Sequence, residues 1–417
     1  MVYIATHNHE KLHHFTLLSL QLSIIEFFFI ILQQNKQVMN KTIAFDNSIA
    51  KISCFENGTE VKEFQVIIQI TNPRLHYHEQ VDTIFNTLTN IRANELENAD
   101  AVFKRYFLSD ATNQSDELLN YELECPSCAL SIIQQAPLNG TKIALWAYLQ
   151  TNVQSKVLAS GLHEVTHGAY KHLWLGSANN LAKDSERQTR ILLNDYIMQL
   201  IKEGCSLANN CMRTWFFVND VDLNYHGVVK ARNEVFITQN LTDKTHFIAS
   251  TGIGGRQAEA RVLSQMDAYA VDGIKREQIH YLYAASHLNR TSDYGVSFER
   301  GTYIDYGDRR HVLISGTASI NSKGEIMHRG DVVAQCHRMW ENIETLLAEA
   351  GCTYDDAMQM IVYLRDPADY ETIKQLYQER FPDKPWVIVN AKVCRPGWLI
   401  EMETMAIKTQ QTEFPTF

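Results

Sequence analysis

Two glutamates late in the chain have the spacing of a proton-donating pair. Glu401 and Glu403 alternate with apolar residues in a stretch that reads as a strand over residues 399–407. Residues two apart on a strand point to the same face of a sheet, and like charges held so close raise the pKa of one carboxyl group. A buried acid of this kind can donate a proton near neutral pH, and Glu403 is the first choice. A solvated strand face is the alternative, because unpaired glutamates are usually exposed.

Three arginines could hold a small molecule that carries carboxylates. A guanidinium binds a carboxylate through two parallel hydrogen bonds, which a lysine cannot reproduce. The candidates are Arg232, Arg300 and Arg395, although each alone could be a surface residue in a weak ion pair. Cys394 could be a nucleophile or, as is commoner for a buried cysteine, part of a pocket wall.

A glycine-rich segment, residues 250–255, contains Thr251 and Gly252. Its backbone N–H groups could approach an anion closely. Ordinary turn chemistry explains the glycines equally well.

Two further motifs resemble metal or redox sites. Residues 163–167 read His-Glu-Val-Thr-His, the zinc-protease pattern, which requires a helix to bring both histidines to one face. Here glycines flank the motif and a strand-like segment follows it. Cys125 and Cys128 form a C-x-x-C without a second pair, which supports neither a zinc ribbon nor a clear redox site. No metal and no cofactor are therefore predicted.

The elements that must position these residues repeat three times. A glutamine opens an amphipathic helix, and 30 to 32 residues later an aspartate ends the following apolar strand. The pairs are Gln80 with Asp110, Gln188 with Asp220, and Gln335 with Asp366. The period is far longer than the ~20–50 residues of a solenoid repeat, so the repeated unit is a domain.

The three units are predicted at residues 60–152, 165–272 and 298–409, with 273–297 as a connector. Each reads as β-β-α-β-α-β-β, which predicts an α+β fold with a mixed sheet and its helices on one face. Residues 1–38 stand apart. Their apolar stretch, 17–32, contains Gln21 and Glu26 and is shorter than the ~20 residues of a spanning helix. It predicts a leader or a wrongly extended start rather than a membrane anchor.

Composition excludes some classes of protein. The net charge of −10 over 417 residues argues against a nucleic-acid binder, whose surface is basic. A small anionic substrate is still possible, because a few local arginines can hold one. Eight scattered cysteines are typical of a reduced, cytoplasmic protein rather than of a disulfide framework.

The third unit resembles the RidA (YjgF) superfamily, a small fold related in shape to chorismate mutase. The resemblance is carried by residues 313–318, by the helix that Gln335 opens, and by residues 362–366 and 395–403. Members form trimers with sites between neighbours. Three units in one chain therefore resemble such a trimer made covalent.

A longer resemblance, over about residues 205–409, is to the chorismatases, fused RidA-like enzymes that cleave the enolpyruvyl ether of chorismate. The chain departs from simple RidA deaminases at Lys374, where asparagine is usual. It departs again at Val393 and Cys394, where their carboxylate-binding arginine would fall, since the arginine is displaced to Arg395. These differences argue against plain imine-deaminase activity.

The resemblance implies a cofactor-free enzyme with its site between units two and three. Glu403 or Glu401 would protonate the vinyl carbon of an enolpyruvyl ether, and pyruvate would leave. The residues implied in substrate binding are Tyr225, Arg232, Thr251, Gly252, Arg300, Ser315, Gly316, Thr317 and Arg395.

Two alternatives remain open. One is hydrolysis of an enamine or imine, as in simple RidA proteins, and the other is a ligand-binding module without turnover. Neither a nucleic-acid nor a membrane partner is expected. A pseudo-trimer of this kind could act as a monomer or as a homo-oligomer.

Overall fold

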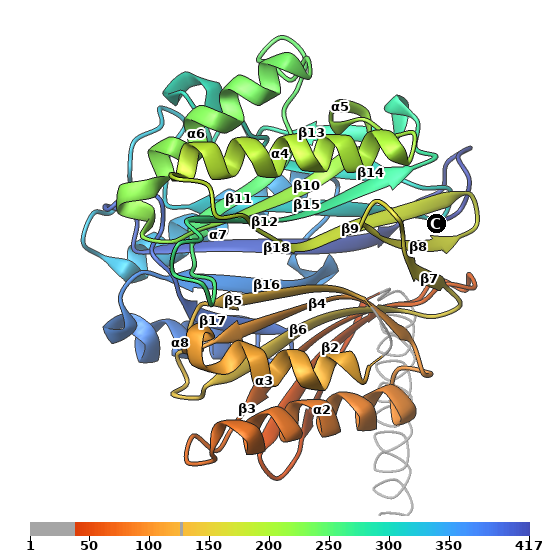
Figure 1. Ribbon diagram of the computed structural model, residues 1–417, viewed down its shortest axis with the longest axis vertical. Helices are drawn as coiled ribbons and strands as arrows, with labels where there is room; N and C mark the ends of the chain where they lie inside the picture. Colours follow the sequence, from red (N-terminus) through yellow and green to blue (C-terminus); the bar gives the residue numbers. More distant parts are fainter. Residues whose placement is uncertain (1–37, 126–127) are drawn as a thin grey trace, which may run out of the picture.

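A computed structural model describes residues 38–125 and 128–417 and contains three six-stranded sheets (Figure 1). Each sheet arises from the same succession of three strands, a helix, a strand, a helix and two strands, with one additional short helix in the second. We name the sheets with their helices units one, two and three. The predicted α+β fold of three tandem units is confirmed, and each unit has one more initial strand than the predicted order β-β-α-β-α-β-β.

Each unit has its own bounds. Unit one contains β1 (Val38–Ala44), β2 (Ser48–Phe55), β3 (Glu63–Ile70), α2 (Tyr77–Asn94), β4 (Asp100–Leu108), α3 (Ala111–Leu123), β5 (Ala129–Gln134) and β6 (Ile143–Gln150). Unit two contains β7 (Gln154–Val157), β8 (His163–His167), β9 (Tyr170–Ala178), α4 (Ser185–Lys202), α5 (Leu207–Asn210), β10 (Cys211–Val218), α6 (Val221–Thr238), β11 (Ala249–Gly254) and β12 (Ser264–Asp272). Unit three contains β13 (Ile279–Leu282), β14 (Gly301–Asp305), β15 (Arg309–Ala318), α7 (Val332–Glu349), β16 (Ala357–Leu364), α8 (Tyr370–Arg380), β17 (Trp386–Asn390) and β18 (Ile400–Thr409).

The strand order is the same in all three sheets: β1-β2-β3-β6-β4-β5, β7-β8-β9-β12-β10-β11 and β13-β14-β15-β18-β16-β17. One pair in each sheet is parallel, namely β4 with β5, β10 with β11, and β16 with β17. A parallel pair requires a crossover connection, which α3, α6 and α8 supply. The other neighbours are antiparallel, so each unit is a mixed sheet as predicted.

The repeated glutamines do not open their helices, as the sequence suggests, but each is the fourth residue of its helix, α2, α4 or α7. Gln80, Gln188 and Gln335 are fully buried. The Oε1 atom of each accepts a hydrogen bond from the backbone at or just before the last strand of its unit, donated by Lys142 N (2.8 Å), Leu263 N (2.7 Å) and Leu399 N (2.9 Å). Each Nε2 donates to backbone carbonyls before the helix. A buried amide that pairs in both directions fixes the helix start against the sheet.

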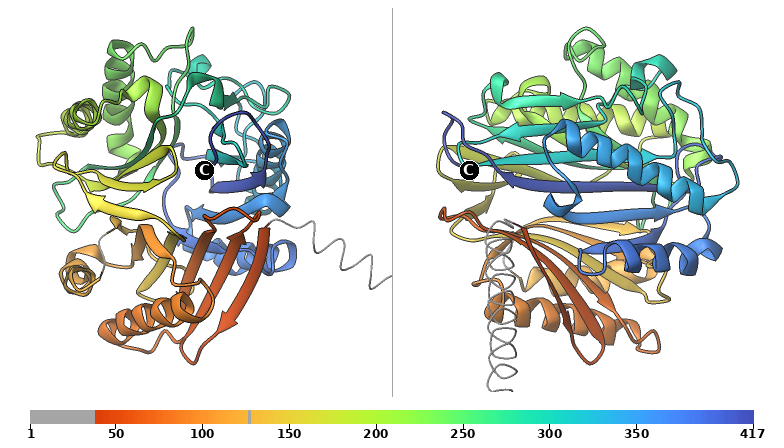
Figure 2. Two further views of the ribbon diagram at one scale, coloured as in Figure 1. Left: turned by 90° about the vertical axis from the view of Figure 1, so that its right-hand side faces the viewer. Right: turned by 180° about the vertical axis from the view of Figure 1, so that it is seen from behind.

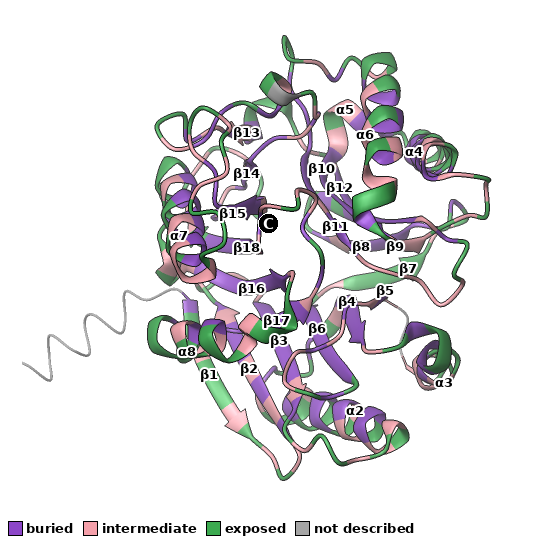
Figure 3. Cartoon of the chain, turned by 90° about the vertical axis from the view of Figure 1, so that its left-hand side faces the viewer, coloured by how far each residue is buried: buried purple, intermediate pink, exposed green. Residues whose placement is uncertain are grey.

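The three sheets surround a common centre, with the helices on the outside (Figure 2). Three isolated bridges close the ring in a cyclic way: Gln134 with Arg256, Ile253 with Val393, and Val389 with Pro137. In each, the last residues of a parallel edge strand meet the segment that follows the equivalent strand of another unit. Figure 3 shows buried residues along the strands and exposed ones on the outer helix faces. The chain is therefore a pseudo-trimer.

The first strands of the units were not anticipated. The sequence places the unit starts at residues 60, 165 and 298, whereas the sheets begin at Val38, Gln154 and Ile279. β7 is exposed along its whole length and β13 has four residues. Such edge strands lack the alternation of buried and exposed residues by which a strand is recognised. The connector 273–297 thus contributes β13 to unit three.

The predicted leader, apart from Val38, lies outside the described residues. Within residues 38–125 and 128–417, no helix combines the length and the apolar character needed to cross a membrane.

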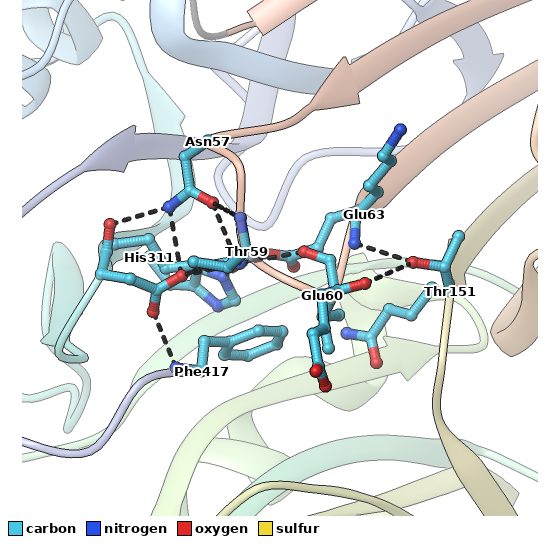
Figure 4. A network of polar contacts seen from close by, with 12 residues as sticks. Asn57, Thr59, Glu60, Glu63, Thr151, His311 and Phe417 are labelled. Atoms are coloured by element: carbon cyan, nitrogen blue, oxygen red, sulfur yellow. Dashed lines mark hydrogen bonds and ion pairs between the residues drawn. The ribbon is translucent and has the colours of Figure 1, made fainter.

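Glu63 joins units one and three near the end of the chain (Figure 4). It accepts hydrogen bonds from Arg309 Nη1 at 2.6 Å and from Tyr148, and its Oε1 lies 2.9 Å from His311 Nε2. The backbone N–H of Phe417 donates to Asp308 beside them, at 2.7 Å. Burial raises the pKa of Glu63, but His311 and Arg309 together outweigh it and hold this pKa well below its usual value of 4.5.

We expect Glu63→Gln to destabilise the protein by about 1–3 kcal/mol, because the fully buried Arg309 loses one of its two carboxylate partners and keeps Asp308 at 2.8 Å. A depressed carboxyl pKa adds stability that is complete above about pH 4.5 and is lost as the pH falls towards the folded value. The variant should therefore lose less stability than the wild type on acidification below pH 4.5. Urea unfolding at several pH values measures both effects. Glu371→Gln, at an exposed side chain, should change little, and an equally small effect at Glu63 would contradict the assignment.

Candidate active site

A cavity of about 360 Å³ lies between units two and three. Unit two contributes α6 and β11, and unit three contributes β15, the start of β18 and the segments before β14 and after β17. Eight of the twelve predicted site residues line it: Tyr225, Arg232, Gly252, Arg300, Gly316, Cys394, Arg395 and Glu401. The other four, Thr251, Ser315, Thr317 and Glu403, are buried behind this wall. The structure thus brings most of the candidate residues together between units two and three.

Glu401 is the buried acidic group on the cavity wall. The other carboxylate that lines it, Asp222, is paired with Arg365 and Lys392. Glu401 lies near the start of β18 between β15 and β16, opposite Ala318 and Tyr363, and is almost fully buried. Burial, and then the nearby charge of Glu403, raise the pKa of Glu401 to about 8, against the opposing effect of Arg213 and Arg300. Its carboxyl group therefore carries a proton at neutral pH.

Glu403, two residues further along β18, has a different environment. Oε2 accepts hydrogen bonds from Arg213 at 2.8 Å and Thr251 at 2.5 Å. Oε1 accepts from Trp215 Nε1 at 2.9 Å and from Arg105 at 3.4 Å. Two guanidinium groups thus compensate its charge, and its oxygens are engaged away from the cavity.

The order of preference between the two acids changes accordingly. The sequence puts Glu403 first as proton donor, although nothing in the strand pattern distinguishes it from Glu401. In the structure only Glu401 lines the cavity. Arg213 and Arg105, which hold Glu403, were missed by sequence reasoning. Their signal is an arginine within a largely buried strand, β10 and β4 respectively.

Gly316 makes room for the Glu401 carboxyl group. The pairing of β15 with β18 shifts register between Ile314 and Thr317, and Gly316 lies in this bulge. A Cβ atom at Gly316 would lie 2.2 Å from Glu401 Oε1, so a side chain here would displace the acid. The backbone N–H of Gly316 donates to Thr251 Oγ1 at 2.9 Å. This bond links unit three to the Thr251 that also contacts Glu403.

Ser315 and Thr317 have supporting positions. Ser315 Oγ accepts a hydrogen bond from Ser250 N at 2.9 Å and donates to Glu299 O at 2.6 Å. It thereby connects β11 of unit two with β15 and the segment before β14 in unit three. Thr317 Oγ1 donates to Ser315 O at 2.9 Å. Both residues shape the seam rather than the cavity surface.

Arg232, on α6, provides unsatisfied hydrogen-bond donors at the cavity. Its side chain is 1% exposed, and its Nε and Nη2 atoms have no hydrogen-bond partner among the described residues. Buried donors without partners are rare in folded proteins because each costs free energy. An acceptor-bearing ligand in the cavity would satisfy them.

A second guanidinium lies near the first. Arg300 Nη2 donates to the backbone and side-chain oxygens of Asn289, both at 3.1 Å. Arg232 and Arg300 both lie over the ring of Phe298, at 5.9 and 5.4 Å from its centroid. Phe298 was not among the predicted site residues, although it lies only two residues before Arg300 in the sequence. Arg395 stacks on Trp398 at 4.8 Å and completes a cationic lining.

Cys394 is placed as a wall residue. Burial, and then the neighbouring Glu401, raise the pKa of its thiol to about 12. Only the thiolate is a good nucleophile, so this environment disfavours covalent chemistry at the sulfur. Tyr225 lines the same cavity and lies against Gly252, where a Cβ atom would come within 2.8 Å of the tyrosine ring.

The zinc-like motif does not form a zinc site. Residues 163–167 form strand β8 rather than a helix. Residues four apart on a strand lie about 13 Å from each other, too far for His163 and His167 to share an ion. Among the described residues, no group of three or more His, Cys, Asp or Glu could hold a metal.

Comparisons with known proteins agree with this architecture. The family described as Endoribonuclease L-PSP matches residues 300–408. A 3-aminoacrylate deaminase RutC from Acinetobacter baylyi is 33% identical over 97 residues, which are 23% of this chain and 77% of that protein. A RutC family protein from Pyrococcus abyssi is 35% identical over 100 residues, 23% of this chain and 78% of its own.

Two further relatives extend beyond unit three. A 3-hydroxybenzoate synthase from Streptomyces hygroscopicus is 28% identical over 217 residues, which are 47% of this chain and 63% of that protein's length. A chorismatase crystal structure covers 73% of this chain and 92% of its own, with a TM-score of 0.58 and 16% identity. Identity this low shows the shared fold alone. The repeated architecture and these matches place the chain in the RidA (YjgF) superfamily, with a resemblance to the chorismatases.

Proposed function

We propose that the cavity binds a small enolpyruvyl ether with carboxylate groups, chorismate or a similar compound, and that Glu401 protonates it so that pyruvate is released. The observation that carries this proposal is that one cavity is lined both by a buried, protonated acid, Glu401, and by Arg232, whose Nε and Nη2 atoms have no hydrogen-bond partner among the described residues. The 3-hydroxybenzoate synthase relative, whose name gives a small cyclic carboxylate as product, fits a ligand of this kind.

The proposed chemistry requires no group beyond the chain and water. Glu401 transfers its proton to the terminal carbon of the vinyl group, and an oxocarbenium ion forms at the ether-bearing carbon. Water or a neighbouring oxygen of the substrate adds there; when water adds, the hemiketal collapses to pyruvate and an alcohol. The proton released on addition restores Glu401. The reaction with water therefore consumes one water molecule per ether bond cleaved.

The surrounding residues fit these steps. A general acid works best when its pKa lies near the operating pH, which burial and Glu403 achieve for Glu401. Arg232 and Arg300 would hold the substrate carboxylates, because charge-assisted hydrogen bonds from guanidinium groups are strong and directional. The apolar side of the cavity, with Val229, Phe298 and Ile320, would accommodate a carbocycle.

Hydrolysis of an imine or enamine is the second candidate, and the two RutC relatives favour it. The same protonated Glu401 could serve that reaction. Lys374, at the position where simple deaminases carry asparagine, pairs with Glu371 at 3.1 Å and does not line the cavity. A binding module without turnover remains the third candidate.

We expect the purified protein to release pyruvate from chorismate, detected by coupling to lactate dehydrogenase. Glu401→Gln should lower the rate by about 10²–10⁴-fold, because a positioned general acid contributes this much. The rate should fall as the pH rises through about 8, where Glu401 loses its proton. Glu371→Gln, at an exposed carboxyl, is the matched control and should retain full activity.

The alternatives give different results in this assay. Absence of pyruvate together with faster loss of 2-aminoacrylate would favour the deaminase. Binding of chorismate without either reaction would favour the module without turnover.

Arg232→Gln should weaken chorismate binding by about ten- to a hundred-fold, because a hydrogen bond to a charged group contributes about 1.5–3 kcal/mol. Calorimetric titration in the Glu401→Gln background measures affinity without turnover. Arg187→Gln, on the exposed face of α4, removes the same charge away from the cavity and should leave affinity unchanged. Equal affinities for the two arginine variants would exclude Arg232 as a carboxylate ligand.

A further inference from the structure

Arg105 is a residue of unit one whose side chain lies at the centre of the molecule, in contact with units two and three. It lies on β4, its side chain is fully buried, and its Nη2 donates to Asp267 Oδ2 of unit two at 2.8 Å. Its Nη1 lies 3.4 Å from Glu403 Oε1 of unit three. The rings of Trp146 and Trp215 enclose the guanidinium, at 5.0 and 4.9 Å. One side chain thus contacts a carboxylate from each of the other two units.

The central charges balance. Arg105 and Arg213 supply two positive charges, and Asp267 and Glu403 supply two negative ones. Asp267 also accepts a hydrogen bond from Ser177 N at 2.7 Å. Arg105 is shared, so the charge that it offers Glu403 depends on Asp267.

This balance reaches the cavity through Glu403. The groups whose charge acts on Glu401 are Glu403 on the same strand, Arg213 on β10 and Arg300 before β14. Tyr363 on β16 and Cys394 after β17 also face it. Among these, Glu403 is the one that Arg105 contacts. No residue of unit one is among those that line the cavity.

We propose that Arg105 and Asp267 are positioning residues for the proton donor: together they set how much of the Glu403 charge acts on Glu401, and so give unit one a part in the chemistry of the other two. The assignment of Glu401 as donor rests on the proposed function. The charge coupling itself rests on the contacts alone.

The two residues should shift the pKa of Glu401 in opposite directions. Asp267→Asn removes a negative charge and leaves Arg105 to Glu403, so the Glu401 pKa should fall. Arg105→Met removes a positive charge and leaves Glu403 less compensated, so the Glu401 pKa should rise. In the double variant the two changes oppose each other. Shifts of about one unit are expected for charges at this depth, and the double variant should lie between the single ones.

Infrared spectroscopy can follow Glu401 without any substrate. Protein labelled with ¹³C-glutamate shows a carboxylic-acid C=O band, and the part that Glu401→Gln removes belongs to Glu401. Titration of that band gives its pKa in the wild type, in Asp267→Asn, in Arg105→Met and in the double variant. Glu122→Gln is the matched control, because Glu122 forms a buried pair with Lys104 (3.0 Å), the neighbour of Arg105 on β4. It should leave the band unchanged.

The outcomes separate the inference from the proposed function. Opposite shifts in Asp267→Asn and Arg105→Met support the inference even where no pyruvate is formed from chorismate. Where pyruvate is formed, the alkaline limb of its pH profile should move with the band. An unchanged titration in Asp267→Asn overturns the inference. Asp267→Asn preserves the side-chain shape, so this arm decides the question even where Arg105→Met does not fold.

Discussion

The burial of Glu403 at the meeting point of three sheets constrains the rest of the structure. A carboxylate removed from water is stable only with close cationic and hydrogen-bonding partners. Its partners come from other units: Arg105 from unit one, and Arg213, Trp215 and Thr251 from unit two. All three units therefore contribute to the environment that compensates this charge. The cyclic bridges between the edge strands serve the same closure.

Two acids two residues apart acquire different roles from this arrangement. The strand period directs Glu401 and Glu403 to one face, but Glu403 lies deeper and takes the available guanidinium groups. Glu401 is left with a buried position and a negative neighbour, so it keeps a proton. A small displacement along one strand thus separates an ion-pair member from an acid. The Gly316 bulge provides the space in which that acid can face the cavity.

The repeated pattern of helices and strands was sufficient to predict the three units apart from their first strands, and the family resemblance predicted the seam and eight of the residues that line the cavity. The repeated glutamines mark the first turn of each long helix, and the buried side-chain bonds of Gln80, Gln188 and Gln335 show why. Arg105 and Arg213 could not be assigned from sequence, since Arg105 meets Glu403 across 298 residues. The preference for Glu403 over Glu401 changes for the same reason. How deeply a side chain is buried between two units depends on tertiary packing, and the alternation of residues along one strand does not reveal it.

Fusion of the three units permits a centre that identical subunits could not build. Strand register shows which residues of the three units are equivalent. Glu403 pairs with Ile361 in unit three, Asp267 with Trp215 in unit two, and Trp146 with Arg105 in unit one. The contact of Arg105 with Asp267 therefore repeats, between units one and two, the contact of Trp215 with Glu403 between units two and three. Three copies of Glu403 around one axis would repel one another, and three copies of Arg105 would do the same. In a single chain each position can differ, so two acids and two arginines neutralise one another. The equivalents of Glu401, namely Gln265 and Ala144, carry no charge. One seam can then hold a protonated acid while the other two need only pack.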